Sequence, residues 1–138
     1  MDWIREGGSV VSEHVTGNEV VVIDPASVEP GSLRYDRGFV TKLVGPEIGA
    51  AKVDLHFNRI KVGSEPGPYH IHTNAENVYY VFSGTASIRS GADTFTVTPG
   101  HVVFIPPMVP HAVSNEGPEE LVIMEIYAPA GADFQEVD

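Results

Sequence analysis

The sequence contains no cysteine among its 138 residues. Disulfide bonds and thiolate ligands are therefore excluded, and any metal ion must be held by nitrogen and oxygen atoms. The absence of cysteine fits a reducing compartment, so we expect a cytoplasmic protein. The N-terminus has no basic segment followed by an apolar one, and we expect no signal peptide.

Basic residues are also few. Eight lysines and arginines stand against 19 aspartates and glutamates, which gives a formal net charge of −11 at pH 7. Such a field repels polyanions, so we expect neither a nucleic-acid partner nor an anionic membrane surface. The chain also lacks any apolar run near the roughly 18 residues that a membrane-spanning helix needs.

Long helical patterns are missing as well. Glycine and proline, 14 and 11 residues respectively, separate short runs rich in valine, isoleucine, phenylalanine, tyrosine and threonine. Many short strands at close spacing predict an all-β domain, built as a sandwich or a barrel. We predict strands at 19–23, 39–44, 51–62, 69–72, 77–82, 85–90, 93–97, 101–105, 112–115 and 121–127.

The predicted organisation is a single domain over residues 1–138. Its core covers about 39–128 and is preceded by an N-terminal arm, residues 1–38. The best helix is a short one near 26–28. The polar segments 25–38 and 128–138 are expected to be the most mobile.

Three histidines are the most informative residues of the sequence. His70 and His72 are separated by one residue, and His111 lies far downstream in a proline-bounded segment. Side chains at positions i and i+2 of a strand point to the same face. Two imidazoles can thus aim at one point, and a third from another strand would complete a metal-binding triad.

Residues 63–84 resemble the first motif of the cupin family. That motif runs from a glycine through His-x-His to a glutamate and a closing glycine, here Gly84. Residues 91–115 resemble the second motif, whose matching parts are Pro99-Gly100, Ile105-Pro106, Pro110-His111 and Asn115. The chain departs from the family at two positions. Met108 replaces the usual glycine, and His101 stands where an acidic residue is common. The resemblance implies a double-stranded β-helix, or jelly-roll barrel, with one divalent ion near its wide mouth.

The position of the motif glutamate departs from the family pattern. Counted back from Gly84, it is occupied by Asn77, and Glu76 comes one residue earlier. Neighbouring strand residues point to opposite faces, so only one of the two can face the metal. We predict that Asn77 does, because the strand is regular up to Gly84; if the preceding loop absorbs the extra residue, Glu76 is the ligand instead.

A neutral amide in this place changes the chemistry of the site. Three imidazoles and an amide leave a divalent ion with its full charge of +2, which makes it a stronger Lewis acid. Such a site favours an anionic, chelating substrate. The ligands implied are His70, His72, Asn77 and His111, and the metals compatible with imidazole are Fe, Mn, Ni and Zn.

Similar three-histidine cupins include dioxygenases, and isomerases and lyases use much the same site. The leading hypothesis is therefore a metal-dependent enzyme acting on a small organic substrate, with dioxygenase-like chemistry favoured. The alternative is a non-catalytic protein that binds a sugar or an organic acid; a storage protein is a remote third. An isomerase would need a general base, for which the candidates are Glu76, Tyr79, Glu125 and His56.

Small cupins resembling this chain are usually dimers, so we expect a homodimer. Edge strands and apolar barrel faces tend to be covered by pairing. The segment 9–15 and the outward-facing positions Val78, Tyr80 and Phe82 are the predicted cover elements.

Overall fold

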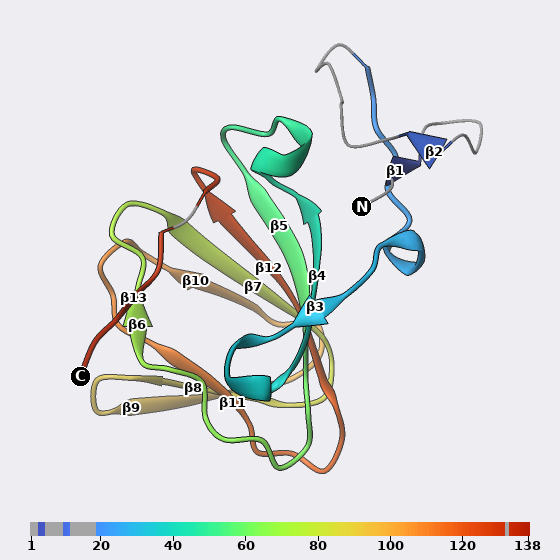
Figure 1. Ribbon diagram of the computed structural model, residues 1–138. Helices are drawn as coiled ribbons and strands as arrows, with labels where there is room; N and C mark the ends of the chain where they lie inside the picture. Colours follow the sequence, from blue (N-terminus) through green and yellow to red (C-terminus); the bar gives the residue numbers. More distant parts are fainter. Residues whose placement is uncertain (1–2, 5–9, 12–18, 132) are drawn as a thin grey trace.

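Antiparallel strands make up nearly all of the regular structure (Figure 1). The computed structural model describes residues 3–4, 10–11, 19–131 and 133–138. The strands are β1 (Trp3–Ile4), β2 (Val10–Val11), β3 (Gly31–Ser32), β4 (Gly38–Val44), β5 (Asp54–Ile60), β6 (His70–Ile71), β7 (Glu76–Ser83), β8 (Ala86–Ser90), β9 (Asp93–Val97), β10 (Val102–Ile105), β11 (Ala112–Asn115), β12 (Leu121–Ala128) and β13 (Gln135–Glu136). Single 3-10 turns occur at η1 (Pro25–Ser27), η2 (Arg34–Asp36) and η3 (Pro46–Ile48). Within these described ranges, no helix is long and apolar enough to cross a bilayer.

Apart from the separate pair β1-β2, the strands form two layers. One is a six-stranded sheet in the order β10-β7-β12-β5-β4-β3, and the other contains β11-β8-β9. An antiparallel bridge between His70 and His111 joins the pair β13-β6 to the edge of the second layer. That layer therefore continues as β13-β6-β11-β8-β9, and the two layers together have the double-stranded β-helix arrangement.

The hydrophobic core fills the space between the layers. Alternate residues of each strand face inward, as the two-residue period of a strand requires. Tyr79, Val81 and Ile123 from the larger sheet meet Ile88 and Val113 from the smaller one in a single buried cluster. The site described below lies at the open end of this same interior.

A second apolar cluster lies on the outer face of β4 and β5. Val28 and Leu43 are buried there, with Val21, Ile23 and Phe57 packed against them. The predicted strand at 19–23 is not formed: Val22 makes only an isolated β-bridge, while Val21 and Ile23 pack their side chains on the sheet. The alternating apolar pattern is the same in both cases, so periodicity could not separate them.

Gly84 makes the tight turn between β7 and β8 and thereby fixes the register of β7. Its φ is +79°, and an added Cβ would lie 2.5 Å from the carbonyl oxygen of Glu120. Glycine alone fits this backbone without strain. Counting back from this turn, odd-numbered residues of β7 face inward, and Asn77, Tyr79 and Val81 are all buried.

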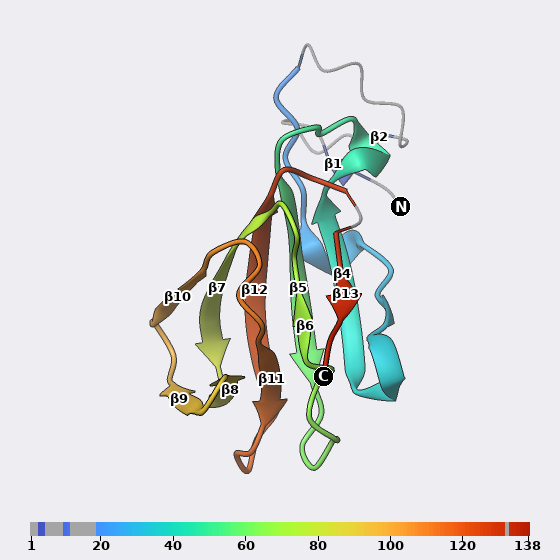
Figure 2. The ribbon, with the colours of Figure 1, turned by 90° about the vertical axis from the view of Figure 1, so that its left-hand side faces the viewer.

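The C-terminal segment packs across the open side of the fold. β13 pairs with β6 with Glu136 opposite His70, and both views show the two strands side by side (Figure 1 and Figure 2). The segment that precedes β4 lies near this tail, where the Tyr35 hydroxyl donates to Glu136 at 2.7 Å. Both segments expected to be mobile thus make specific contacts.

Candidate metal centre and its pocket

His70, His72 and His111 converge at the mouth of the interior. Their possible ligand atoms all lie within 4.8 Å of one another, and all three side chains are buried. His70 and His111 exchange both backbone hydrogen bonds at 3.0 Å, which puts their side chains next to each other on one face. His72 follows two residues after His70 and returns to that face. The strand pairing therefore builds the triad.

The backbone sets which nitrogen of each ring faces the cluster. The Nδ1–H groups of His70 and His111 donate to the carbonyl oxygens of Pro68 at 2.8 Å and Val109 at 2.9 Å. The corresponding group of His72 donates to the carbonyl of Asp133. A carbonyl can only accept, so each Nδ1 carries the proton and each Nε2 keeps a free lone pair.

Those free nitrogens fit a metal ion. The Nε2 atoms of His72 and His111 are buried and have no hydrogen-bond partner among the described residues. An unpaired buried nitrogen is costly unless something coordinates it. Ligating histidines commonly donate their other N–H to a carbonyl in this way. Burial also lowers the pKa of His70 to about 4 and lowers that of His111, so these rings stay neutral and able to coordinate.

The C-terminal segment holds two of the three rings in place. The carboxylate of Asp133 accepts hydrogen bonds from Thr73 N at 2.8 Å, Asn74 N at 2.9 Å and Ala75 N at 2.8 Å. The loop after His72 is thereby fixed. Phe134 stacks on His70, with ring centroids 4.4 Å apart and planes at 24°.

A pocket of about 590 Å³ opens beside the cluster. His70 and His72 line it, together with inward-facing residues of β4, β5 and β12, while His111 does not line it and is only 1% exposed. Tyr127 stacks on His72 at 5.6 Å and meets His56 edge-on at 5.8 Å. A single tyrosine ring thus separates the histidine cluster from the next polar group of the pocket.

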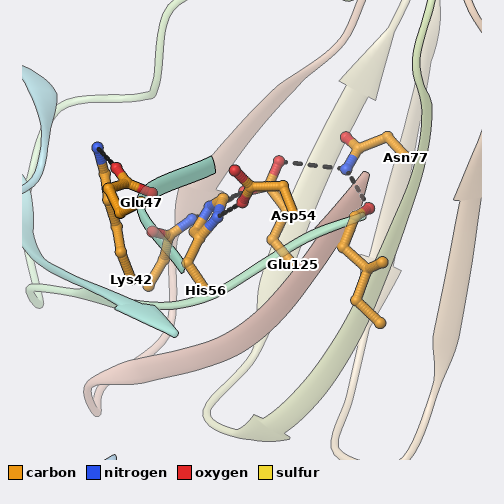
Figure 3. A network of polar contacts seen from close by, with 8 residues as sticks. Lys42, Glu47, Asp54, His56, Asn77 and Glu125 are labelled. Carbon is orange, nitrogen blue, oxygen red and sulfur yellow. Dashed lines mark hydrogen bonds and ion pairs between the residues drawn. The ribbon is translucent and has the colours of Figure 1, made fainter. Parts of the chain in front are cut away.

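The next polar group of the pocket is a chain of three ionisable residues on β5 and β12, Asp54, His56 and Glu125, seen at close range in Figure 3. His56 Nδ1 lies 3.0 Å from Asp54 Oδ1, and its Nε2 lies 3.1 Å from Glu125 Oε2. Burial opposes a charge on this ring, but hydrogen bonds to both carboxylates outweigh it and raise the pKa of His56 to about 9. Burial likewise opposes ionisation of Glu125, yet the contact with His56 lowers the pKa of that carboxyl to about 2. These two shifts favour a protonated His56 beside an ionised Glu125 at neutral pH.

Asn77 joins this chain on its far side (Figure 3). Its Nδ2 donates to Glu125 Oε1 at 3.2 Å and to the carbonyl of Ile126 at 3.0 Å. Both partners are acceptors, which fixes the amide orientation and leaves Oδ1 buried and without a partner in the described structure. Glu76 is exposed and does not line the pocket, so the structure does not bring it to the other predicted groups.

The remaining predicted residues come together. Glu125 and His56 line the pocket, and so does Tyr79, whose pKa is raised by burial. Sequence reasoning missed Asp133, Phe134 and Arg37, which contact the cluster or line the same pocket. Asp133 and Phe134 lie in a segment with no strand pattern, and their contacts depend on a long-range strand pairing. The sequence feature that could have pointed to them is Phe134, a single aromatic residue in the acidic C-terminal segment.

Comparisons with known proteins found relatives in sequence and in fold. A glucose-6-phosphate isomerase of Thermococcus gammatolerans is 28% identical over 128 residues, which is 88% of this chain but only 63% of that protein. Among solved structures, the polyketide cyclase RemF of Streptomyces resistomycificus matches with a TM-score of 0.73 at 20% identity, covering 84% of both chains. A putative sugar phosphate isomerase of Acidithiobacillus ferrooxidans matches with a TM-score of 0.60 at 27% identity, covering 74% of this chain and 67% of that one.

The family assignment comes from the sequence that carries the site. The model of the cupin domain matches residues 57–127, more than half of the chain. This range includes His70, His72, His111 and Glu125, and His56 precedes it by one residue. The chain belongs to the cupin family.

Proposed function

We propose that this protein is a metal-dependent enzyme that moves a proton on a small oxygen-rich organic substrate, as an isomerase or a lyase does. The observation that carries the proposal is the position of His56, held between the carboxylates of Asp54 and Glu125 in the pocket that His70 and His72 line. Isomerases among the relatives support the same class. Since the match spans only part of the Thermococcus protein, that protein's substrate is not carried over.

The histidine cluster supplies the electrophilic half of this chemistry. His70, His72 and His111 would hold the ion, with Asn77 Oδ1 as the proposed fourth donor, and Fe, Mn, Ni or Zn suits such a set. A bound divalent ion polarises a carbonyl or hydroxyl oxygen and makes a neighbouring C–H more acidic. Tyr127 stacks on His72 and walls off one side of the cluster.

The charged chain supplies the proton-transfer half. Both N–H groups of the His56 imidazolium point at carboxylates, Nδ1–H at Asp54 and Nε2–H at Glu125, so the ring would exchange a proton with the substrate through one of these carboxylates. Asn58 Nδ2 donates to Glu125 at 2.9 Å, which keeps that carboxylate aligned with the imidazole. The polar chain and the cluster are separated by one ring, so one small molecule can reach both.

The dioxygenase chemistry expected from the sequence is the second candidate. The neutral donor set favours it, because three imidazoles and an amide leave the ion its full charge to hold an anionic, chelating substrate. Non-catalytic binding of a sugar or an organic acid would use the same pocket without turnover.

One experiment separates these functions. Metal-loaded protein is incubated in D2O with a panel of hydroxy-aldehydes, hydroxy-ketones, keto acids and diketones, while NMR follows C–H exchange and an electrode follows O2. We expect deuterium to enter carbon-bound positions without O2 uptake, and His56→Gln to reduce exchange at least 100-fold while metal content stays unchanged. O2 uptake would favour the dioxygenase, and binding with neither signal would favour a binding protein.

A further inference from the structure

The basic residues of this acidic chain are concentrated at the pocket. Arg34, Arg37 and Lys42 line it, out of only eight lysines and arginines in the sequence. Among the described residues, four carboxylates line it too, but each is already engaged. Asp54 and Glu125 flank His56, Asp133 accepts from three backbone N–H groups, and Glu47 lies 4.0 Å from Lys42.

The two arginines are left without an acidic partner. Neither Arg34 nor Arg37 forms an ion pair with any carboxylate in the part of the chain that the structure describes. Arg37 is only 6% exposed. Buried charges are almost always paired, because removing them from water is expensive. Burial lowers the pKa of the Arg37 guanidinium, and the nearby Tyr79 offsets this effect only in part.

Arg37 is held with part of its donor capacity unused. Nε donates to the carbonyl of Glu65 at 3.1 Å, and Nη2 donates to the carbonyl of Val113 at 2.8 Å. A guanidinium has five N–H donors, so the others remain available at the pocket wall. The planar guanidinium group can direct two parallel N–H donors, as a fork, at the oxygen atoms of a carboxylate or a phosphate.

The backbone leaves room for this guanidinium. A Cβ added at Gly67 would lie 2.8 Å from Arg37 Nη2 and 2.9 Å from its Cζ, so any side chain there would displace the fork. Gly67 and Val113 also border the metal cluster, since they lie three residues before His70 and two residues after His111. The fork is thus anchored to the same two segments that carry these ligands.

Arg34 lies next to the cluster by way of Phe134. Its guanidinium lies 4.0 Å from the centroid of Phe134, and the same ring stacks on His70. One aromatic ring therefore separates this cation from a metal ligand. The charged chain of His56 lies farther along the strands, because His56 pairs with Lys42 while Gly38, next to Arg37, pairs with Ile60. That offset of four residues is roughly 13 Å of strand.

We propose that Arg37 and Arg34 form a subsite for an oxyanion of the substrate, a carboxylate or a phosphate group, at the end of the pocket away from His56. This inference rests on the proposed function only in taking the pocket as the substrate site. A purely structural Arg37, tying the loop at Glu65 to β11, would explain the two carbonyl contacts. It would not explain why a buried charge is used where a neutral donor would serve.

The test is a titration of zinc-loaded, 15N-labelled protein with inorganic phosphate and, separately, with acetate. The side-chain Nε–Hε signals of the arginines report binding at each guanidinium. We expect saturable shifts of Arg37 and Arg34, with the tighter of the two anions identifying the group. Affinity should fall at least tenfold in Arg37→Gln and in the exposed-site variant Arg34→Gln, and should be largely kept in Arg37→Lys.

Arg89→Gln is the matched control, because Arg89 stacks on Tyr69 and does not line the pocket. Unfolding curves show whether Arg37→Gln folds, and Arg34→Gln decides the question if it does not.

Absence of saturable shifts at both arginines, or equal anion affinity in the two Gln variants and wild type, overturns the subsite. Anion binding without C–H exchange would leave the subsite standing and sink the proposed function. C–H exchange on neutral substrates without anion binding would overturn the subsite and leave the proposed function standing.

Discussion

At the scale of single residues, hydrogen bonds to backbone carbonyls decide how the histidine cluster behaves. They place the proton of each ring on Nδ1 and turn the unprotonated nitrogens inward. His-x-His alternation on a strand made the first two rings predictable. The partnership of His111 with His70 was not predictable from spacing alone, because it depends on a bridge between strands distant in sequence.

Asn77 provides a prediction at this scale. Asn77→Asp keeps the shape of the side chain but adds a negative charge facing Glu125, and it loses the donor to Ile126. Without metal the variant should be destabilised by about 1–3 kcal/mol, because buried polar groups lose partners. With a divalent ion, affinity should rise at least tenfold, since a carboxylate now faces the cation.

Calorimetric metal titration and urea unfolding check both effects. The control is Glu76→Gln, which changes an exposed side chain on the opposite face of β7 and should alter neither quantity. If Glu76→Gln weakens metal binding while Asn77→Asp leaves it unchanged, Glu76 is the ligand.

His56 makes stability depend on pH in a defined window. Its pKa rises from 6.5 to about 9 on folding, so the folded protein retains a proton that the unfolded chain loses. This contribution is complete below pH 6.5 and disappears as pH rises through 9. From 1.36 kcal/mol per pH unit, wild type should lose roughly 3 kcal/mol across that window relative to His56→Gln.

Urea unfolding at pH 6.5, 7.5, 8.5 and 9.5 in the presence of a chelator measures this difference. His101→Gln, on the exposed turn before β10, should track wild type throughout. A wild-type advantage over His56→Gln that does not shrink with pH would mean that His56 is not charged between its two carboxylates.

At the scale of elements, the C-terminal strand is the part that sequence patterns could not reveal. Alternation and turn residues predicted β4, β5 and β7 to β12 within a few residues, because each is long enough to show a period. β3 and β13 have two residues each and no period. β13 nevertheless pairs with the strand that carries His70, and its neighbour Asp133 fixes the loop after His72.

Asp133→Ala should therefore lower the affinity for metal, although Asp133 is not one of the three histidine ligands. Three backbone N–H groups lose their acceptor, and the loop beside His72 loosens. We expect a loss of metal affinity of about 10- to 100-fold, the range seen when groups that orient metal ligands are removed. Metal titration of this variant and of Asp138→Ala, a charge-matched change at the end of the same tail, gives the comparison. Equal affinity in the two variants would show that the tail does not position His72.

At the scale of the whole molecule, the outer face of β7 and β10 remains apolar and exposed. Tyr80 lies opposite Val102 and Val78 opposite Phe104, and Phe82 continues the row. Phe82, Val102 and Phe104 are 46%, 65% and 57% exposed. β10 is also an edge strand of the six-stranded sheet. The other predicted cover element, 9–15, lies almost entirely outside the described residues.

This face leads us to predict a homodimer, since exposed apolar faces and edges are commonly covered by pairing. Light scattering at micromolar concentration should give twice the 14.9 kDa chain mass for wild type. Phe104→Asp should give the monomer mass, and Phe95→Asp, an equally exposed site on β9, should not. A wild-type mass near 14.9 kDa would rule out this assembly.

The central claim is that His70, His72 and His111 hold one divalent ion. Elemental analysis of purified protein, after dialysis, tests it most directly when wild type is compared with a His70→Ala, His111→Ala double variant whose fold is checked by circular dichroism. We predict about one divalent ion per wild-type chain, bound through imidazole nitrogens as such sites are, and almost none in a folded double variant. Stoichiometric metal in the double variant would contradict the claim.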